Sequence, residues 1–428
     1  MKANRLLIEL MALISVMPVI RANIHPAILL FVFVLWFINA VKLTSINHLL
    51  SDTWGVAKWW GILIVYELVL SLIGFSSVAP NTILTRIPVY FIPVIMTFVL
   101  RNYSVKEQKS LFVFIAGIIV FTILQNIIIY LRDPTFFETF SLKEDMFRWT
   151  NWGTSGFVAC ALFLVPCCFL IWQKRQSGLI KYIAVLGLFL PFIYITFINE
   201  RATSFILLLY FIVALVYVRN VKLKDNISFT VVTLILVGAI SVMLVPLLNW
   251  LSSVLNSEEL VIRLDSISSS IQASEIDENS EGSIFERFYL AQVSIRTWTQ
   301  SPFTLLFGIG EDVLPAGSMG SIFDLDALGI GQHSQIIDFL AMYGIVGTLM
   351  LLKAFQSAFA CIKSYSNDLT MNRELGIVFV GYILMNILNN TIYADELFVM
   401  FLLFGISVRI YTQRVEVSNI LNRKLAGI

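Results

Sequence analysis

The chain has 428 residues, of which 58% are hydrophobic and only 13% are charged, and its formal net charge is +1. Water-soluble domains average about 45–50% apolar and about 25% charged residues, so this composition excludes a soluble globular protein. A net charge near zero gives no sign of nucleic-acid binding. Because the apolar residues form continuous runs rather than weak alternating strands, the sequence predicts an all-α polytopic membrane protein.

About twelve apolar runs approach the roughly 20 residues that an α-helix needs to cross a bilayer. In chain order they lie at 6–20, 24–41, 57–74, 83–100, 110–131, 153–172, 179–199, 202–218, 228–250, 334–360, 375–392 and 396–412. The first run lacks a small-residue cleavage site and is expected to be a retained span rather than a signal peptide. Several runs are short or adjoin a neighbour, so one or two of them are alternatively re-entrant segments.

The lysines and arginines predict the orientation, because cytoplasmic loops retain positive charge. With twelve spans and a cytoplasmic N-terminus, 20 of the 29 Lys and Arg residues fall on the cytoplasmic side. The exported side receives Arg21, Arg86, Arg132, Lys143, Arg148, Arg201, Arg263, Arg287 and Arg296. Both termini are therefore expected in the cytoplasm.

The predicted organisation has three parts. Residues 1–250 hold transmembrane helices 1–9, residues 251–333 form one large exported loop, and residues 334–428 hold helices 10–12 with the C-terminus. The loop has twelve acidic residues against three arginines, a net charge of −9. Inside it an amphipathic helix is predicted from Phe285 to Thr299. Its apolar stripe is formed by Phe288, Ala291, Ile295 and Trp298.

Ionisable residues within or beside the spans are candidates for function, because a bilayer disfavours them. Glu67 lies in the middle of a span, where a structural hydrogen bond is favoured over a proton relay. His333 lies where the loop re-enters the membrane. A histidine with a pKa of about 6.5 can take a proton from a hydroxyl at neutral pH, although an interfacial histidine is alternatively a hydrogen-bonded cap. Asp338 either orients that imidazole or caps a polar pocket. His25 and His48 are expected in short loops.

Four arginines on the exported side are candidates for binding phosphate, because a guanidinium group pairs with phosphate through two hydrogen bonds. Arg201 follows Glu200 in a tight turn between two spans, Arg287 and Arg296 belong to the loop helix, and Arg86 adjoins a span. The alternative is that Arg201 pairs with Glu200 or neighbouring acids and that Arg287 pairs with Glu286 or Glu281. The four cysteines place no pair in an exported loop, so neither a disulfide nor a zinc site is expected.

The order of residues in the C-terminal third is distinctive. An arginine in a loop helix is followed by Trp298, Ser301-Pro302, Gly308-Ile-Gly310, His333, and a span that begins Ser-Gln-Ile-Ile-Asp and contains Tyr343-Gly344-Ile-Val-Gly347. This order resembles the O-antigen polymerase (Wzy) and O-antigen ligase superfamily. The segment Asn199 to Ser204 resembles the second arginine site of that family.

The resemblance implies a GT-C-type glycosyltransferase of the bacterial inner membrane that acts in lipopolysaccharide or other surface polysaccharide biosynthesis. Such an enzyme is inverting, independent of metal and without a cofactor, and its active site faces the periplasm. It moves a growing glycan from undecaprenyl pyrophosphate to the non-reducing end of a new lipid-linked repeat unit. By the same resemblance, Arg287 and Arg201 bind the pyrophosphate, and His333 positions or deprotonates the acceptor hydroxyl. Weaker substrate contacts are expected from Arg296, Arg86, Asp338 and Glu200.

The implied partners are lipid-linked repeat units, a chain-length regulator of the Wzz type and a flippase of the Wzx type. Two alternatives stay open. A ligase would transfer the same glycan to the lipid A core, and the polymerase is favoured by the form His-Ser…Asp-x-x-x-x-Tyr-Gly-Ile-Val-Gly and by the acidic loop. A lipid-linked oligosaccharide flippase, from another functional class, would need charged residues along a path through the membrane, for which Glu67 and Asp338 are the candidates.

Overall fold

The computed structural model describes residues 2–73, 80–132, 155–173, 178–198, 202–220, 284–310, 330, 334–366, 369–388 and 399–412. Within these residues, six helices are long and apolar enough to cross a membrane. They lie at Pro26–Thr44, Ile46–Leu72, Ile83–Asn102, Val105–Arg132, Leu179–Thr196 and Ile336–Lys363. The chain is therefore an all-α polytopic membrane protein.

The helices follow the predicted apolar runs. Their bounds are α1 Lys2–Val16, α2 Pro18–Asn23, α3 Pro26–Thr44, α4 Ile46–Leu72, α5 Pro80–Tyr90, α6 Ile92–Asn102, α7 Val105–Arg132, α9 Ser155–Gln173, α10 Leu179–Phe197, α11 Ala202–Asn220, α14 Ile284–Trp298, α15 Pro302–Phe307, α16 Gln335–Lys363, α17 Leu369–Leu388 and a last helix at Val399–Thr412. Each run overlaps one of these helices except 228–250, which lies outside the described residues. Twelve spans and the three-part organisation stay predictions.

Proline sets several helix boundaries. Pro18, Pro26 and Pro302 each stand at the start of a helix, where the missing N–H group has no helical partner to lose. The run predicted at 83–100 is divided at Phe91, and Pro93 lies in the first turn of α6. His25 accepts a hydrogen bond from the amide of Ala27 and so caps α3. His48 lies inside α4, so its expected place in a loop is wrong.

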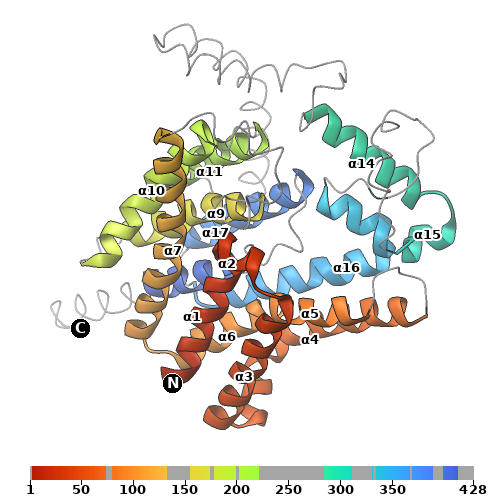
Figure 1. Cartoon of the computed structure of the whole chain (residues 1–428), viewed down its shortest axis with the longest axis horizontal. Helices are drawn as coiled ribbons and strands as arrows, with labels where there is room; N and C mark the ends of the chain where they lie inside the picture. Colours follow the sequence, from red (N-terminus) through yellow and green to blue (C-terminus); the bar gives the residue numbers. More distant parts are fainter. Residues whose placement is uncertain are drawn as a thin grey trace, which may run out of the picture.

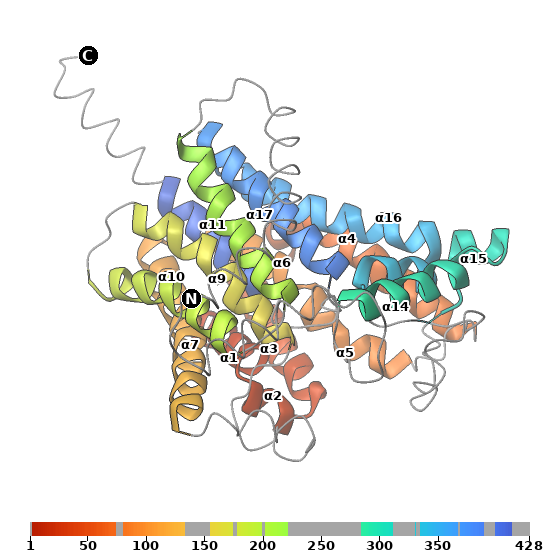
Figure 2. The same cartoon turned by 90° about the horizontal axis from the view of Figure 1, so that it is seen from above.

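Two groups of helices are visible in both views (Figures 1 and 2). In the first, α4 and α16 run side by side and are contacted by α5, α6, α14 and α15. In the second, α10 packs on α7 and α9, and α11 packs on α9 and α17. The helix α7 runs across the direction of α4 and α16. The candidate site belongs to the first group.

Buried aromatic rings hold α4, α5 and α16 together. The ring of Trp60 on α4 stacks on that of Tyr90 on α5 with centroids 5.7 Å apart, and it meets Phe355 of α16 edge-on at 5.5 Å. Phe355 in turn packs on Tyr382 of α17 at 4.8 Å. Ring pairs of this geometry add stability beyond the apolar area that they bury. These contacts fix the position of α16, which carries Asp338.

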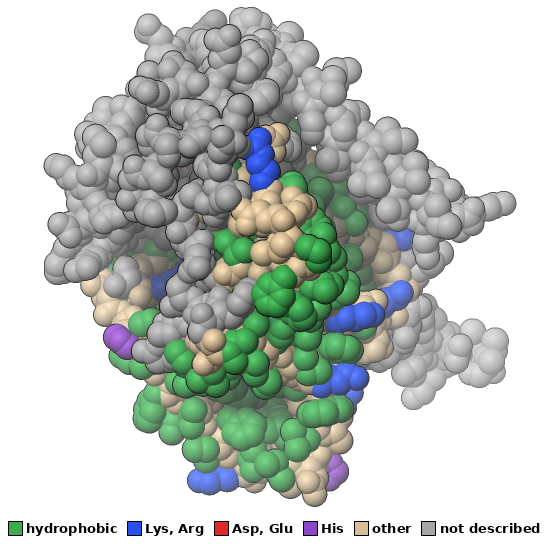
Figure 3. Space-filling view, turned by 90° about the vertical axis from the view of Figure 1, so that its right-hand side faces the viewer, with side chains coloured by type: hydrophobic (Ala, Val, Ile, Leu, Met, Phe, Trp, Pro, Cys, Tyr) green, Lys and Arg blue, Asp and Glu red, His purple; other side chains and the backbone are tan. Residues whose placement is uncertain are grey.

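The outer surface of the described residues is strongly apolar. Phe31, Val65 and Phe189 are each at least 60% exposed, as expected for side chains that face lipid. Figure 3 shows the side of the molecule on which α15 lies in Figure 1. Its coloured side chains are mostly apolar with scattered cations, and no Asp or Glu of the described residues is visible there. Two carboxylates that the structure describes in this region, those of Glu67 and Asp338, are buried.

Candidate active site

The helix α14 confirms the helix predicted in the loop, and the predicted apolar stripe is right in part: Ala291 is buried and Trp298 is partly buried against the core. Ile295 is wrongly placed in that stripe, since it is 41% exposed, whereas the polar side chains of Ser294 and Thr297 are at most 1% exposed. The side chain of Phe288 lies outside the described set. Apolar periodicity misplaces Ile295 because an isoleucine can face outward in a lipid environment. Polar side chains such as that of Ser294 can instead form hydrogen bonds between helices inside the protein.

The polar face of α14 is held by Asp338. This carboxylate is 1% exposed and accepts two hydrogen bonds, one from Ser294 Oγ at 2.5 Å and one from the backbone N–H of Ser334 at 3.0 Å. The second bond satisfies an amide at the start of α16, where helical backbone donors lack partners. Asp338 therefore has the geometry of a cap that also ties α14 to α16. A role in orienting an imidazole stays a prediction.

The structure describes the predicted catalytic residues only in part. His333, Arg201 and Glu200 lie outside the described residues, and of Arg287 only the backbone is described. Position 287 precedes Ser294 by seven residues, about two helical turns, so the two positions share one side of α14. Position 333 directly precedes Ser334, the amide of which is bound by Asp338. The backbone near both predicted residues is thus anchored to the same carboxylate.

Arg296 lies on another side of α14. It follows Ser294 by two residues, which in a regular helix turns its position by about 200° away. Its side chain is half-buried. The structure therefore does not bring Arg296 to the face that Ser294 and position 287 share.

A break in α16 follows Asp338 by six residues. Gly344 has φ 63° and ψ −167°, a non-helical conformation that favours glycine. Such a break leaves carbonyl groups without helical donors. The carbonyl of Ala341 accepts from Ile309 N–H at 2.8 Å, that of Met342 from Gly310 N–H at 2.9 Å, and that of Tyr343 from Tyr66 Oη at 3.1 Å. Three consecutive carbonyls thus receive donors from α4 and from the segment after α15.

Gly308 and Gly344 allow this contact. A Cβ atom on Gly308 would collide with the backbone of Met342 and Tyr343, and one on Gly344 would collide with the backbone of Leu306 and Phe307. A Cβ atom on Gly347 would come within 2.9 Å of the Tyr66 ring. Gly344 and Gly347 thus let neighbouring segments approach closely, and Gly344 additionally bends its helix.

The short helix α15 is fixed by the residues that precede it. Ser301 and Thr304 form a reciprocal capping box, and Trp298 Nε1 donates to the carbonyl of Leu305 at 2.9 Å. Thr304 Oγ1 also donates to the carbonyl of Trp298 at 3.0 Å. The residues Trp298-x-x-Ser-Pro-x-Thr therefore stabilise the turn between α14 and α15. This turn places Gly308 against the backbone of α16.

A second buried carboxylate lies in the same group of helices. Glu67 of α4 is fully buried and accepts a hydrogen bond from Tyr90 Oη at 2.9 Å, while Arg86 Nη1 of α5 lies 3.8 Å from its other oxygen. This arrangement matches the structural hydrogen bond favoured for Glu67. A buried carboxylate needs such partners, because the loss of its hydration costs on the order of several kcal/mol.

Arg86 also borders a cavity of about 240 Å³. Arg21, His25 and Tyr90 contribute to its lining, together with apolar residues of α1 and α3. Two guanidinium groups beside one cavity suit an anionic ligand. Arg21, Tyr66, Tyr90 and Ser294 were not singled out by the sequence, because what distinguishes them is the partner across the helix interface.

Comparison of the sequence with models of known protein families found no match, and comparison with curated proteins found none either. In the described residues there is no group of three or more His, Cys, Asp or Glu side chains that is arranged to hold a metal ion.

Proposed function

We propose that the chain is a membrane glycosyltransferase of the O-antigen polymerase type. It would act at the exported surface of the bacterial inner membrane, with both termini in the cytoplasm. The donor would be a glycan on undecaprenyl pyrophosphate, and the acceptor the non-reducing sugar of a second lipid-linked repeat unit. The motif order from Arg287 to Gly347 and the apolar, polytopic architecture support this proposal.

The strongest structural support for this proposal is the hydrogen bond between Ser294 and Asp338. The bond from Ser294 to Asp338 joins the helix of Arg287 to the segment that follows His333. The remaining motif residues, from Trp298 to Gly308 and Gly344, form the packed turn beside this bond. Residues that are more than 40 positions apart in sequence therefore belong to one rigid unit, as a site built from them requires.

The chemistry follows from these residue types. The acceptor hydroxyl oxygen attacks the anomeric carbon from the side opposite the pyrophosphate, a new glycosidic bond forms, and the bond between the anomeric carbon and the pyrophosphate oxygen breaks. His333 would receive the hydroxyl proton. Arg287 and Arg201 would stabilise the charge that develops on the departing undecaprenyl pyrophosphate. Inversion at the anomeric carbon results.

Purified protein incubated with lipid-linked repeat units alone tests the proposal. A ladder of glycans on lipid is expected. A product that forms only when lipid A core is added would instead show a ligase, and lipid translocation in proteoliposomes without a ladder would show a flippase. Either of these two results would overturn the polymerase assignment.

Variants then test the assigned roles. Arg287→Ala, Arg201→Ala and His333→Ala are each expected to abolish the ladder while the protein stays in the membrane. Thr299→Ala is the matched control, because this side chain is exposed at the end of α14 and bonds only to backbone carbonyls of its own helix. Full ladders from the three variants would remove the mechanism.

A further inference from the structure

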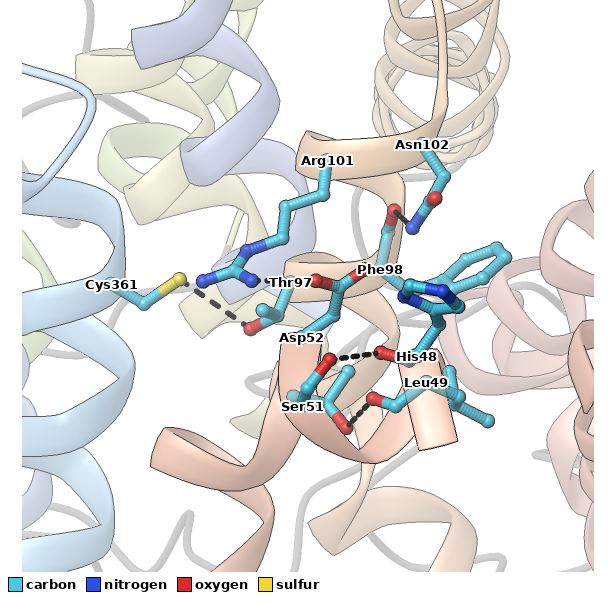
Figure 4. Close-up of polar contacts among 10 residues, drawn as sticks. His48, Leu49, Ser51, Asp52, Thr97, Phe98, Arg101, Asn102 and Cys361 are labelled. Carbon is cyan, nitrogen blue, oxygen red and sulfur yellow. Dashed lines mark hydrogen bonds and ion pairs between the residues drawn. The ribbon is translucent and has the colours of Figure 1, made fainter. Parts of the chain in front are cut away.

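A cavity of about 570 Å³ lies between α4, α6 and α16, away from the candidate active site. Its lining includes Asp52, Lys58, Arg101, Lys353 and Cys361. Figure 4 shows the facing side chains: Arg101 of α6 reaches toward Asp52 of α4, with Cys361 of α16 on the opposite side of the guanidinium group. The volume is within the range of about 300–1,000 Å³ that is usual for small-molecule sites.

The cavity has an excess of positive charge. Asp52 Oδ1 accepts a hydrogen bond from Arg101 Nη1 at 2.7 Å, so the one carboxylate among the described lining residues is engaged. Lys58 Nζ lies 5.5 Å from the centroid of the Trp59 ring, and Lys353 Nζ donates to the amide oxygen of Gln356 at 2.9 Å. Among the described residues, neither lysine forms an ion pair with a carboxylate. Three cations against one anion predict an anionic ligand.

The residue types favour phosphate over a carboxylate ligand. A phosphate carries several acceptor oxygens around one centre, which an arginine fork and two mobile ammonium groups can share. The three cations come from three different helices, so one ligand bound among them would contact α4, α6 and α16 together. To bind this ligand, Lys58 would have to leave only the Trp59 ring, and Lys353 only the side-chain amide of Gln356.

The surroundings of the cavity favour a lipid as the carrier of that phosphate. Leu50 and Trp54 of α4 are 43% and 58% exposed beside the lining residues Ser51 and Gly55. Tryptophan is enriched at the depth of lipid head groups. Lys58, Arg101 and Lys353 all belong to the set that the charge distribution assigns to the cytoplasmic side, where anionic lipids concentrate. An acyl chain can lie along the exposed apolar side chains while the head group enters the cavity.

We propose that this cavity binds the phosphate of an anionic phospholipid head group. The proposal is independent of the glycosyltransferase function, because it rests on residues at the opposite end of α4 and α16. A soluble phosphate shares the same chemistry, so the experiment must separate the two sources.

Two different changes to the cavity are available. Lys58→Gln with Lys353→Gln removes two cations and preserves side-chain length. Gly55→Leu keeps every charge and fills the cavity, since a Cβ atom at Gly55 meets nothing within 4 Å and Gly55 has no positive φ. Lys42→Gln with Lys363→Gln is the matched control, because it removes the same charge from the same side without touching the lining.

Binding is measured by native mass spectrometry of the full chain in detergent, with phosphatidylglycerol, with phosphatidylcholine as the neutral lipid, and with inorganic phosphate as the soluble arm. Wild type and the Lys42/Lys363 control are expected to retain phosphatidylglycerol preferentially. We expect each of the two cavity lysines to contribute roughly 5-fold to phosphatidylglycerol binding, as one basic side chain beside an anionic lipid surface does, so the Lys58/Lys353 variant should bind roughly 25-fold more weakly. Gly55→Leu should also lose the lipid.

Equal retention of phosphatidylglycerol by all variants would overturn the proposal, and so would equal binding of phosphatidylcholine. If inorganic phosphate binds with the same dependence on the variants and phosphatidylglycerol does not displace it, the ligand is soluble and the lipid assignment is wrong. Gly55→Leu keeps the test decisive if the double lysine variant does not fold.

Discussion

The two ends of the α4–α16 pair use charge in opposite ways. At the end of Asp338 and Glu67, the carboxylates are buried and their oxygens accept from Ser294, Ser334 and Tyr90. At the end of Arg101, the three cations surround an open cavity, with Arg101 and Lys353 exposed and Lys58 half-buried. Buried charges with built-in partners fix the positions of helices, whereas exposed cations can receive a ligand. The first end is therefore built as a rigid site and the second as a binding surface.

The largest expected effect is at the break in α16. Gly344→Ala places a Cβ atom against the backbone of Leu306 in a conformation that disfavours any side chain, and we expect it to destabilise the protein by more than about 3 kcal/mol. The loss of folded protein is measured by size-exclusion chromatography and thermal unfolding in detergent. Gly376→Ala is the control, because a Cβ atom there meets nothing within 4 Å. Equal stability of the two variants would show that the close contact with α15 is not formed.

A smaller loss is expected at Asp338. Asp338→Ala leaves the Ser294 hydroxyl and the Ser334 amide without their acceptor, at a cost of about 2–3 kcal/mol. Asp338→Asn retains one acceptor oxygen and should lose less. Thermal unfolding midpoints of the two variants and of Ser294→Ala measure the order. If Ser294→Ala destabilises the Asp338→Ala background as much as it does the wild type, the two side chains are not coupled.

Variants of Glu67 and Arg86 distinguish the proposed enzyme from a transporter. Arg86→Gln removes the guanidinium group beside the buried Glu67 carboxylate and should destabilise by about 2 kcal/mol, whereas Glu67→Gln keeps the hydrogen bond from Tyr90 and should destabilise less. We expect lipid-linked polymer still to form with Glu67→Gln. A complete loss of function in that variant, with normal stability, would instead indicate a proton relay through Glu67.

The smallest effect is expected at Asp52. Its pair with Arg101 is 2.7 Å long, but the side chains are 27% and 45% exposed, and pairs of this kind contribute about 0–1 kcal/mol. Asp52→Asn should therefore leave thermal stability nearly unchanged and tighten phosphatidylglycerol binding, since it removes the one carboxylate among the described lining residues. Weaker lipid binding in this variant would contradict the excess-charge argument.

The sequence predicted the helices well because an apolar run long enough to cross a bilayer has few other stable conformations. It placed α14 correctly, but it assigned the exposed Ile295 to the buried stripe and missed Ser294, because Ser294 is buried beside a carboxylate 44 residues away in the chain. The sequence could not show that a break at Gly344 leaves carbonyl groups without helical donors, nor that Tyr66 donates to one of them. Both features depend on tertiary contacts. The cavity near Arg101 is built by three helices and has no local sequence signal.

We propose that the glycosyl transfer takes place at the Asp338 end of the α4–α16 pair. This proposal is tested most directly by measuring the rate of polymer formation in two variants that each remove one positive charge, Arg287→Gln on α14 and Lys363→Gln at the other end of α16. We expect Arg287→Gln to abolish the ladder of lipid-linked glycans and Lys363→Gln to preserve it. A ladder of undiminished length and rate from Arg287→Gln would contradict the account.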